Sequence, residues 1–140
     1  MGHVPAGPVS EEGSSAHVQR REHRGTGAGR PTLNRRQLAI AGESLAARFL
    51  VDRDARVVAR NLRVGRGELD LVVAFAERRV AVEVKTIQTG GLDDPAYAFT
   101  PAKAAQVRSL AHRLGIFRVD LVAVSIGSAG VDIRWVPEVG

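Results

Sequence analysis

The chain has 140 residues, 44% of them hydrophobic, which suits one small globular domain. Its formal net charge of +5 favours polyanionic partners such as nucleic acid or an anionic membrane surface, although an arginine-rich coding bias produces the same balance. The absence of cysteine excludes disulfides and thiolate metal sites, and the apolar runs are far too short to cross a bilayer, so we expect a soluble protein.

Residues 1–33 contain hardly any aliphatic side chains and are rich in glycine, proline, serine and charge. Such a segment cannot bury enough apolar surface to offset the entropy of ordering, so the composition predicts a disordered tail. The tail also lacks the apolar core of a signal peptide, and its acids argue against an organelle transit sequence, so we expect a cytoplasmic location. The folded domain is expected over residues 34–140.

Two helices are predicted. From Asn34 onward, apolar residues recur at spacings of three and four, which indicates an amphipathic helix that ends near Asp52. Asn34 suits the cap of this helix. A second helix is predicted from Thr100 to Gly115, because threonine followed by proline is typical of a helix start and glycine of a helix end.

Five strands are predicted. The first three are apolar runs joined by short polar or glycine-containing turns, one of them at residues 77–79, which is typical of an antiparallel meander. Residues 89–99 resemble a loop. The order is helix, three strands, helix, two strands, an α/β fold with a mixed sheet covered by helices. The expected strands are 56–64, 68–76, 80–88, 117–126 and 131–136.

Charged residues interrupt two of these apolar strands. Side chains two residues apart on a strand share a face, so we expect Glu68 and Asp70 on one face and the alternate apolar residues on the other. On the next strand Glu83 and Lys85 share a face in the same way. The apolar residues expected on the opposite faces are Leu69, Leu71 and Val73, and Val80, Val82 and Val84.

The tight turn makes these two strands neighbours. Pairing with residue numbers that add to about 155 brings Asp70 close to Glu83 and Lys85. Carboxylates so close repel one another, and a divalent cation usually offsets this cost; oxygen ligands alone favour Mg²⁺ or Mn²⁺ over zinc. A lysine can orient or deprotonate a water, whereas an arginine stays protonated. The alternative is that Glu83 and Lys85 form only a solvated salt bridge.

Several motifs, taken in one order, resemble the bacterial YraN family, which is assigned to the restriction-endonuclease-like superfamily with its D…(D/E)xK metal site. The resemblance covers roughly residues 36–126. It implies an αβββαβ nuclease core similar to that of archaeal Holliday-junction resolvases. The matching motifs are Gly42-Glu43, Asn61-Leu62-Arg63, Gly67-Glu68-Leu69-Asp70-Leu71, Val82-Glu83-Val84-Lys85-Thr86, Lys103 and Arg118-Val119-Asp120.

The resemblance also implies roles for individual residues. Asp70 and Glu83 would bind the metal and act in catalysis together with Lys85, which would position or activate the attacking water. The chain departs from the family pattern at Ile87, where members more often carry an arginine, so one phosphate contact is missing. Further implied roles are a metal ligand at Glu43 and at the Val84 carbonyl, an outer-shell carboxylate at Glu68, and nucleic-acid contacts at Lys103, Asn61 and Arg63.

Plainer interpretations stay open for several of these residues. Glu43 could be a solvated flank of its helix, and Lys103 an exposed residue of a first helical turn. Asn61 and Arg63 could be ordinary polar groups at a strand end. Asp120 could pair with Arg118 or simply begin its strand.

Three functions are therefore compatible with the sequence. The first is a Mg²⁺-dependent nuclease that hydrolyses phosphodiester bonds in DNA, including branched or structured nucleic acid. The second is a non-catalytic nucleic-acid-binding module with the same fold, and the third a structural or partner-binding protein. The sequence determines neither DNA against RNA nor the oligomeric state, although junction-cutting relatives act as dimers and a homodimer is one state to expect.

Overall fold

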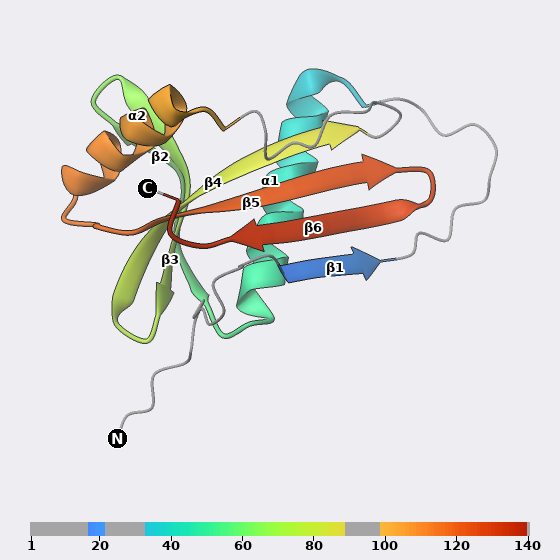
Figure 1. Cartoon of the computed structure of the whole chain (residues 1–140), viewed down its shortest axis with the longest axis horizontal. Helices are drawn as coiled ribbons and strands as arrows, with labels where there is room; N and C mark the ends of the chain where they lie inside the picture. Colours follow the sequence, from blue (N-terminus) through green and yellow to red (C-terminus); the bar gives the residue numbers. More distant parts are fainter. Residues whose placement is uncertain (1–16, 22–32, 89–98, 140) are drawn as a thin grey trace.

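The computed structural model of the chain describes residues 17–21, 33–88 and 99–139, and for residues 17–21 the backbone only. These residues form one six-stranded mixed sheet with two helices, so the expected α/β fold with an αβββαβ core is confirmed (Figure 1). The strand order across the sheet is β1-β6-β5-β4-β3-β2. The elements are β1 (His17–Arg21), α1 (Arg35–Val51), β2 (Arg56–Val64), β3 (Gly67–Phe75), β4 (Arg78–Gln88), α2 (Pro101–His112), β5 (Val119–Gly127) and β6 (Gly130–Val136).

Both helices begin at the predicted caps. The Asn34 side chain accepts a hydrogen bond from the Gln37 backbone nitrogen at 2.8 Å, and the Gln37 side chain accepts one from the Asn34 backbone nitrogen at 3.0 Å. This reciprocal pair satisfies two amides that a helix start would otherwise leave without a partner. At α2 the Thr100 hydroxyl accepts from the Lys103 backbone nitrogen at 3.2 Å, and Pro101 occupies the first turn.

Strands β2, β3 and β4 form the predicted antiparallel meander, whereas β4 and β5 are parallel and are connected through α2. The β3–β4 turn consists of Ala76 and Glu77, so β4 begins at Arg78, two residues before the expected start. Paired residue numbers, as in Leu71↔Val82, add to 153 rather than 155. A shift of two does not by itself move a side chain to the other face, because strand side chains alternate with a period of two.

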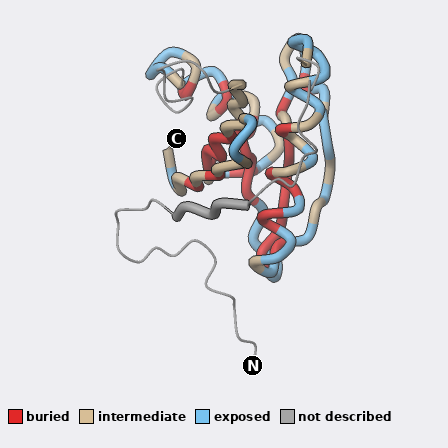
Figure 2. The backbone as a smooth tube through the Cα atoms, turned by 90° about the vertical axis from the view of Figure 1, so that its right-hand side faces the viewer, coloured by how far each residue is buried: buried red, intermediate tan, exposed pale blue. Residues whose placement is uncertain are grey.

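The helices cover opposite faces of the sheet, and each face has its own core. Val80 and Val82 pack in the core cluster that contains residues of α1, whereas Ala81 packs in the cluster that contains residues of α2. Figure 2 shows the buried positions gathered inside the molecule. The expectation that Leu69 shares a face with Leu71 is wrong, since Leu69 packs on the α2 side and Leu71 on the α1 side.

The N-terminal expectation also needs correction, because residues 17–21, predicted as disordered, form the strand β1. This strand pairs with the outer edge of β6 in an antiparallel ladder from His17↔Trp135 to Arg21↔Val131. Edge pairing satisfies backbone amides and carbonyls without any apolar side chain, so composition did not indicate it. The rest of the predicted tail up to residue 32, and the predicted loop from 89 to 98, lie outside the described residues. Of the two described helices, neither is long and apolar enough to cross a membrane.

Candidate functional site

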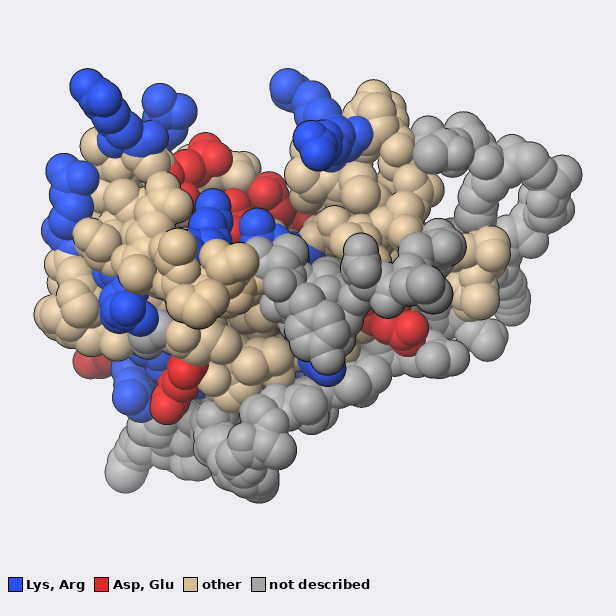
Figure 3. All heavy atoms as spheres, turned by 45° about the horizontal axis from the view of Figure 1, so that its top comes forward, with Lys and Arg blue, Asp and Glu red and all other residues tan. Residues whose placement is uncertain are grey.

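Four acidic residues from three elements form a cluster in which each carboxylate interacts electrostatically with another member. We call this cluster the acidic site. On the face that Figure 3 shows, acidic side chains lie in a hollow, and basic side chains project on both sides of it. Such an arrangement suits a divalent cation at the base of the hollow and a polyanion along its walls. The acidic site consists of Glu43 of α1, Glu68 and Asp70 of β3, and Glu83 of β4.

The acidic site forms where β3 and β4 stop pairing. Their ladder runs from Phe75↔Arg78 to Leu71↔Val82, while β4 continues alongside β5 as far as Gln88↔Ile126. Beyond Val82 the β3 side of β4 therefore needs another hydrogen-bond partner. The Asp70 carboxylate supplies it, since its Oδ2 accepts from the Val84 backbone nitrogen at 2.8 Å. The end of the ladder thus fixes the Asp70 carboxylate against β4.

Glu83 and Lys85 share one face of β4, as the alternation predicts. Glu83 is buried, with 5% of its surface exposed, and its Oε2 lies 3.4 Å from the Lys85 ammonium nitrogen. Val82 and Val84 pack in the α1-side core on the opposite face. The expected convergence is therefore present: a buried carboxylate with a lysine beside it, next to the strand end that carries Asp70.

Negative charge accumulates at Asp70. Burial, and secondly the charge of Glu83, raise the pKa of Asp70 from 3.8 to about 6. The Val84 amide and the charges of Lys85 and Lys103 act in the opposite direction without cancelling the rise. Bringing a cation close to Asp70 would relieve this unfavourable charge. Because the charge of Lys103 lowers the pKa of Asp70, Lys103 lies close enough to act on the site. Within the described residues, however, no ion pair joins its side chain to a carboxylate.

Glu43 reaches the acidic site from α1. Burial raises the pKa of Glu43, the Asn61 hydrogen bond lowers it, and the charges of Asp70 and Glu68 raise it. The Asn61 amide nitrogen lies 3.1 Å from Glu43 Oε1. Asn61, for which a nucleic-acid contact was expected, thus makes a hydrogen bond with this carboxylate. Arg63, the other expected contact on β2, is exposed and lies opposite Glu68 in the β2–β3 ladder.

A close approach of α1 to β4 makes the reach of Glu43 feasible. Gly42 precedes Glu43 and packs against the Thr86 side chain so closely that a β-carbon at residue 42 would lie 2.7 Å from both carbon atoms Cβ and Cγ2 of Thr86. Only glycine allows that approach. The sequence contained both residues in the family motifs, but nothing in their spacing indicated that they meet.

The donor set fits a hard divalent cation only in part. Its carboxylate oxygens are the ligands that Mg²⁺ and Mn²⁺ prefer, and the raised pKa of Asp70 marks a place where positive charge is needed. However, across residues 33–88 and 99–139 no three acidic or histidine side chains lie close enough together to hold a metal ion. Glu83 is paired with Lys85 and Glu43 with Asn61. Asp70 and Glu83 therefore fit as ligands, whereas Glu43, held by Asn61, contributes its charge without completing a three-ligand group.

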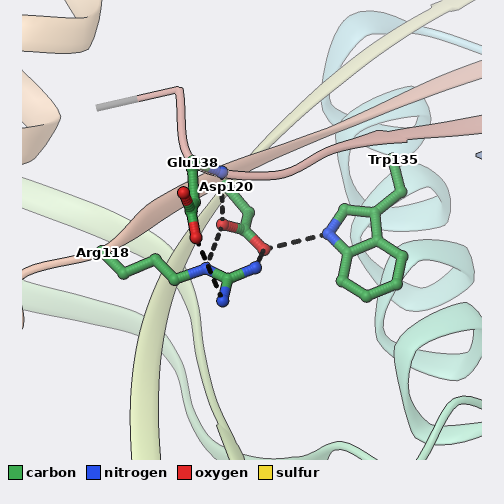
Figure 4. A network of polar contacts seen from close by, with 4 residues as sticks. All are labelled: Arg118, Asp120, Trp135 and Glu138. Atoms are coloured by element: carbon green, nitrogen blue, oxygen red, sulfur yellow. Dashed lines mark hydrogen bonds and ion pairs between the residues drawn. The ribbon is translucent and has the colours of Figure 1, made fainter. Parts of the chain in front are cut away.

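Asp120, the last acid of the family motifs, lies apart in a structural cluster (Figure 4). Its carboxylate is 1% exposed and accepts hydrogen bonds from Arg118 Nε at 2.9 Å, from the Trp135 indole nitrogen at 3.0 Å and from the Glu138 backbone nitrogen at 2.9 Å. The predicted pairing with Arg118 is present. The cluster holds the segment after β6 against the start of β5, which an unaided sequence could not indicate because the partners are up to 18 residues apart.

Comparisons with known proteins agree with the motifs. The model of uncharacterised protein family UPF0102 matches residues 42–124. A UPF0102 protein of Streptomyces coelicolor is 37% identical over 119 residues, which cover 78% of this chain and 92% of that protein. One of Nocardia farcinica is 45% identical over 78 residues, or 56% of this chain and 61% of that protein. A solved structure of Pyrococcus furiosus SfsA in complex with Ca²⁺ aligns with 73% of this chain and 63% of that chain, at a TM-score of 0.35 and 14% identity.

The family match runs from the middle of α1 into β5, so it contains the acidic site together with Lys85 and Lys103. The resemblance noted in the sequence is confirmed by this match and by relatives that align over most of their length. The chain belongs to uncharacterised protein family UPF0102, the YraN family.

Proposed function

We propose that this protein is a Mg²⁺-dependent nuclease that hydrolyses phosphodiester bonds in DNA, with branched or structured DNA among its substrates. The observation that carries the proposal is the position of Asp70: a half-buried carboxylate at the end of a strand ladder, beside a buried carboxylate, Glu83, and the ammonium of Lys85. Burying two like charges together is costly unless a cation joins them, so this arrangement suits a metal-dependent site better than a purely structural one.

Each group has a distinct task in the proposed reaction. Asp70 and Glu83 would hold the Mg²⁺ ion, which would supply positive charge to the phosphoryl group and lower the pKa of a water. Lys85 would orient the attacking water through its ammonium donors, since Glu83 already fixes the ammonium at 3.4 Å. Lys103 would contact a phosphate oxygen. Hydrolysis adds one water across a phosphorus–oxygen bond and leaves one phosphate monoester and one hydroxyl.

Basic side chains outside the acidic site favour a polyanionic substrate. The first turn of α1 carries exposed Arg35 and Arg36 and no acid, although positive charge at a helix start opposes the helix dipole. Exposed Arg60 and Arg63 lie on β2, the strand at the edge of the sheet beside Asp70. The two arginines at the helix start cost some stability, and for all four cations a phosphate backbone is a suitable partner.

The test is a cleavage assay on linear, flapped and branched DNA with Mg²⁺ or Mn²⁺. We expect metal-dependent cleavage by the wild type and a loss of about 100-fold or more in Asp70→Asn, Glu83→Gln and Lys85→Ala. The matched control is Glu77→Gln, which makes the same change as Glu83→Gln at an exposed turn residue and should cleave like the wild type. Equal activity in all variants would refute the proposal.

A second candidate is a nucleic-acid-binding module that does not cleave. Two features favour it: Ile87 departs from the arginine that the family resemblance leads us to expect, and among the described residues no third carboxylate joins Asp70 and Glu83 in a group that could hold a metal ion. A module of this kind would retain DNA in a salt-dependent manner in EDTA, show no turnover with either metal, and keep its DNA affinity in Asp70→Asn. A structural or partner-binding protein, the third candidate, would bind neither DNA nor metal.

A further inference from the structure

Asn61 has an unusual backbone for a residue in the middle of a strand. Its φ is +47°, in the left-handed region that most side chains avoid and that asparagine tolerates better than other non-glycine residues. The residues on both sides of it remain paired with β3. The left-handed residue therefore lies within a continuous ladder and needs a local explanation.

That explanation is a change of face in both strands at the same level. Ala59 and Leu62 of β2 are three residues apart and pack against the same α2-side core, and Leu69 and Val72 of β3 do likewise. In a regular strand, residues three apart face opposite sides. Both strands therefore change face at this level, at matching positions and with the same register on either side; the register shift of β2 lies further along, between Val57 and Ala59. The paired residues on either side of the switch are Arg60↔Leu71 and Leu62↔Leu69.

Asn61 and Asp70 occupy the switch itself, between those two pairs. Both side chains make polar contacts there, Asn61 with Glu43 and Asp70 with the Val84 backbone nitrogen. The Asn61 amide nitrogen donates to Glu43 Oε1 at 3.1 Å. Since an ionised carboxylate can only accept, the amide must present its nitrogen rather than its oxygen to Glu43. The hydrogen bond thus fixes both the amide and the carboxylate.

We infer that Asn61 is a positioning residue, whose left-handed backbone turns β2 at the level of Asp70 and whose amide holds the Glu43 carboxylate beside the acidic site. This inference rests on the proposed function, in which Asp70 and Glu83 hold the divalent cation, and it adds to that function a part for Glu43, whose carboxylate, held by Asn61, brings further negative charge to the acidic site. It differs from the expectation that Asn61 contacts nucleic acid, because one of the two amide N–H donors is engaged by Glu43 within the protein. Asparagine is the residue that combines tolerance of positive φ with an amide donor; glycine has only the first property.

Three variants separate the two tasks. Asn61→Gly keeps the backbone and removes the amide, whereas Asn61→Ala removes the amide and also strains the backbone. Glu43→Ala removes the acceptor. Ala76→Gly is the matched backbone control, since Ala76 also has positive φ, +57°, and lies in the β3–β4 turn outside the acidic site.

Metal affinity is measured by calorimetry with Mn²⁺. We expect Asn61→Gly to weaken Mn²⁺ binding about tenfold, the usual effect of removing a group that orients a metal ligand, and Ala76→Gly to leave it unchanged. In the Glu43→Ala background, Asn61→Gly should have no further effect. We also expect the midpoint of thermal unfolding to be lower for Asn61→Ala than for Asn61→Gly.

DNA affinity in EDTA separates positioning from direct contact. Positioning predicts the same DNA affinity for Asn61→Gly and the wild type when no metal is present. A fall in DNA affinity in EDTA with unchanged Mn²⁺ affinity would overturn the inference and restore the nucleic-acid contact. An equal loss of Mn²⁺ affinity with and without the Glu43 side chain would also overturn it.

Failure of the proposed function gives a different result. If the wild type binds no Mn²⁺ and cleaves nothing, the nuclease proposal fails, and the Asn61–Glu43 pair is then tested by unfolding of the two single variants and the double variant Asn61→Gly/Glu43→Ala. A positioning contact predicts coupling: the double variant should lose less stability than the sum of the losses in the two single variants. Independent single effects would overturn the inference.

Discussion

Gly42 of α1 and Thr86 of β4 are in such close contact that the helix backbone rests on the threonine side chain. Each residue is next to a residue of proposed functional importance: Glu43 of the acidic site follows Gly42, and Lys85 precedes Thr86. The contact therefore sets the distance between the helix that carries Glu43 and the strand that carries Lys85. Space at a single glycine determines how closely the two elements can approach.

Gly42→Ala should displace α1 from β4. The added methyl would overlap Thr86, and overpacking of this kind usually costs about 1–3 kcal/mol of the free energy of unfolding. Because the displacement also withdraws Glu43, we expect weaker Mn²⁺ binding as well. Chemical denaturation and calorimetry measure the two effects.

The companion variant is Gly42→Ala combined with Thr86→Gly, which removes the three atoms nearest to the new methyl. The cost of Gly42→Ala should then fall below its cost in the wild type. If it costs the same in both backgrounds, the contact with Thr86 does not set the position of α1.

Asp70→Asn should stabilise the metal-free protein at neutral pH. The pKa of Asp70 is about 6 in the folded state and 3.8 ordinarily, so the folded state binds the proton more tightly. The stabilisation from this proton is complete below about pH 3.8 and disappears as pH rises through 6. Between pH 4 and pH 7 the free energy of unfolding of the variant, relative to that of the wild type, should therefore increase by about 1–2 kcal/mol, measured by urea unfolding.

Saturating Mg²⁺ should reverse that difference. A cation bound by Asp70 raises the unfolding midpoint of the wild type by mass action and leaves that of Asp70→Asn nearly unchanged. Glu77→Gln, at the exposed turn, should follow the wild type in both conditions. If the increase in stability of Asp70→Asn does not vary with pH, the raised pKa of Asp70 is not its cause.

Asp120→Asn should destabilise the fold without affecting Mn²⁺ binding. The change removes the negative charge beside Arg118, whose side chain is 11% exposed, and a buried pair broken in this way typically costs about 3 kcal/mol. Trp135 donates to the same carboxylate and is the only tryptophan, so its fluorescence reports the unfolding directly.

The control for this prediction is Glu138→Gln. Glu138 lies 3.6 Å from the Arg118 guanidinium, but its side chain is 66% exposed, and an ion pair of that kind contributes little. Similar losses of stability in Glu138→Gln and Asp120→Asn would show that the buried Asp120 carboxylate is not what mainly holds the segment after β6 in place.

Ala76→Gly should stabilise the protein by about 1 kcal/mol. Ala76 has a φ of +57° in the two-residue β3–β4 turn, where a β-carbon is unfavourable and glycine is not. Ala105→Gly makes the same substitution at an exposed position of α2 and should cost about 1 kcal/mol, since glycine disfavours helix. Thermal unfolding of the two variants should therefore shift in opposite directions.

Local patterns in the sequence were enough for most elements. The caps at Asn34 and Thr100 act through residues three positions away, and alternation of apolar residues marks strands, so both can be detected without knowing the fold. The same alternation placed Glu83 and Lys85 on one face of a strand, and a tight turn brought that strand beside Asp70. These features depend on neighbours in the chain.

Contacts between residues far apart in the sequence were decided by the tertiary structure, because short-range patterns carry no information about them. The matched change of face at Asn61 and Asp70 depends on two cores that lie on opposite sides of the sheet, and it moved Leu69 away from its predicted face. The pairing of β1 with β6 joins backbones more than one hundred residues apart and needs no apolar side chain. Sequence by itself thus determined the elements and the charged residues, because local hydrogen bonds and side-chain alternation dictate them; long-range packing determined which of those charges meet, because only the assembled layers set the distances between them.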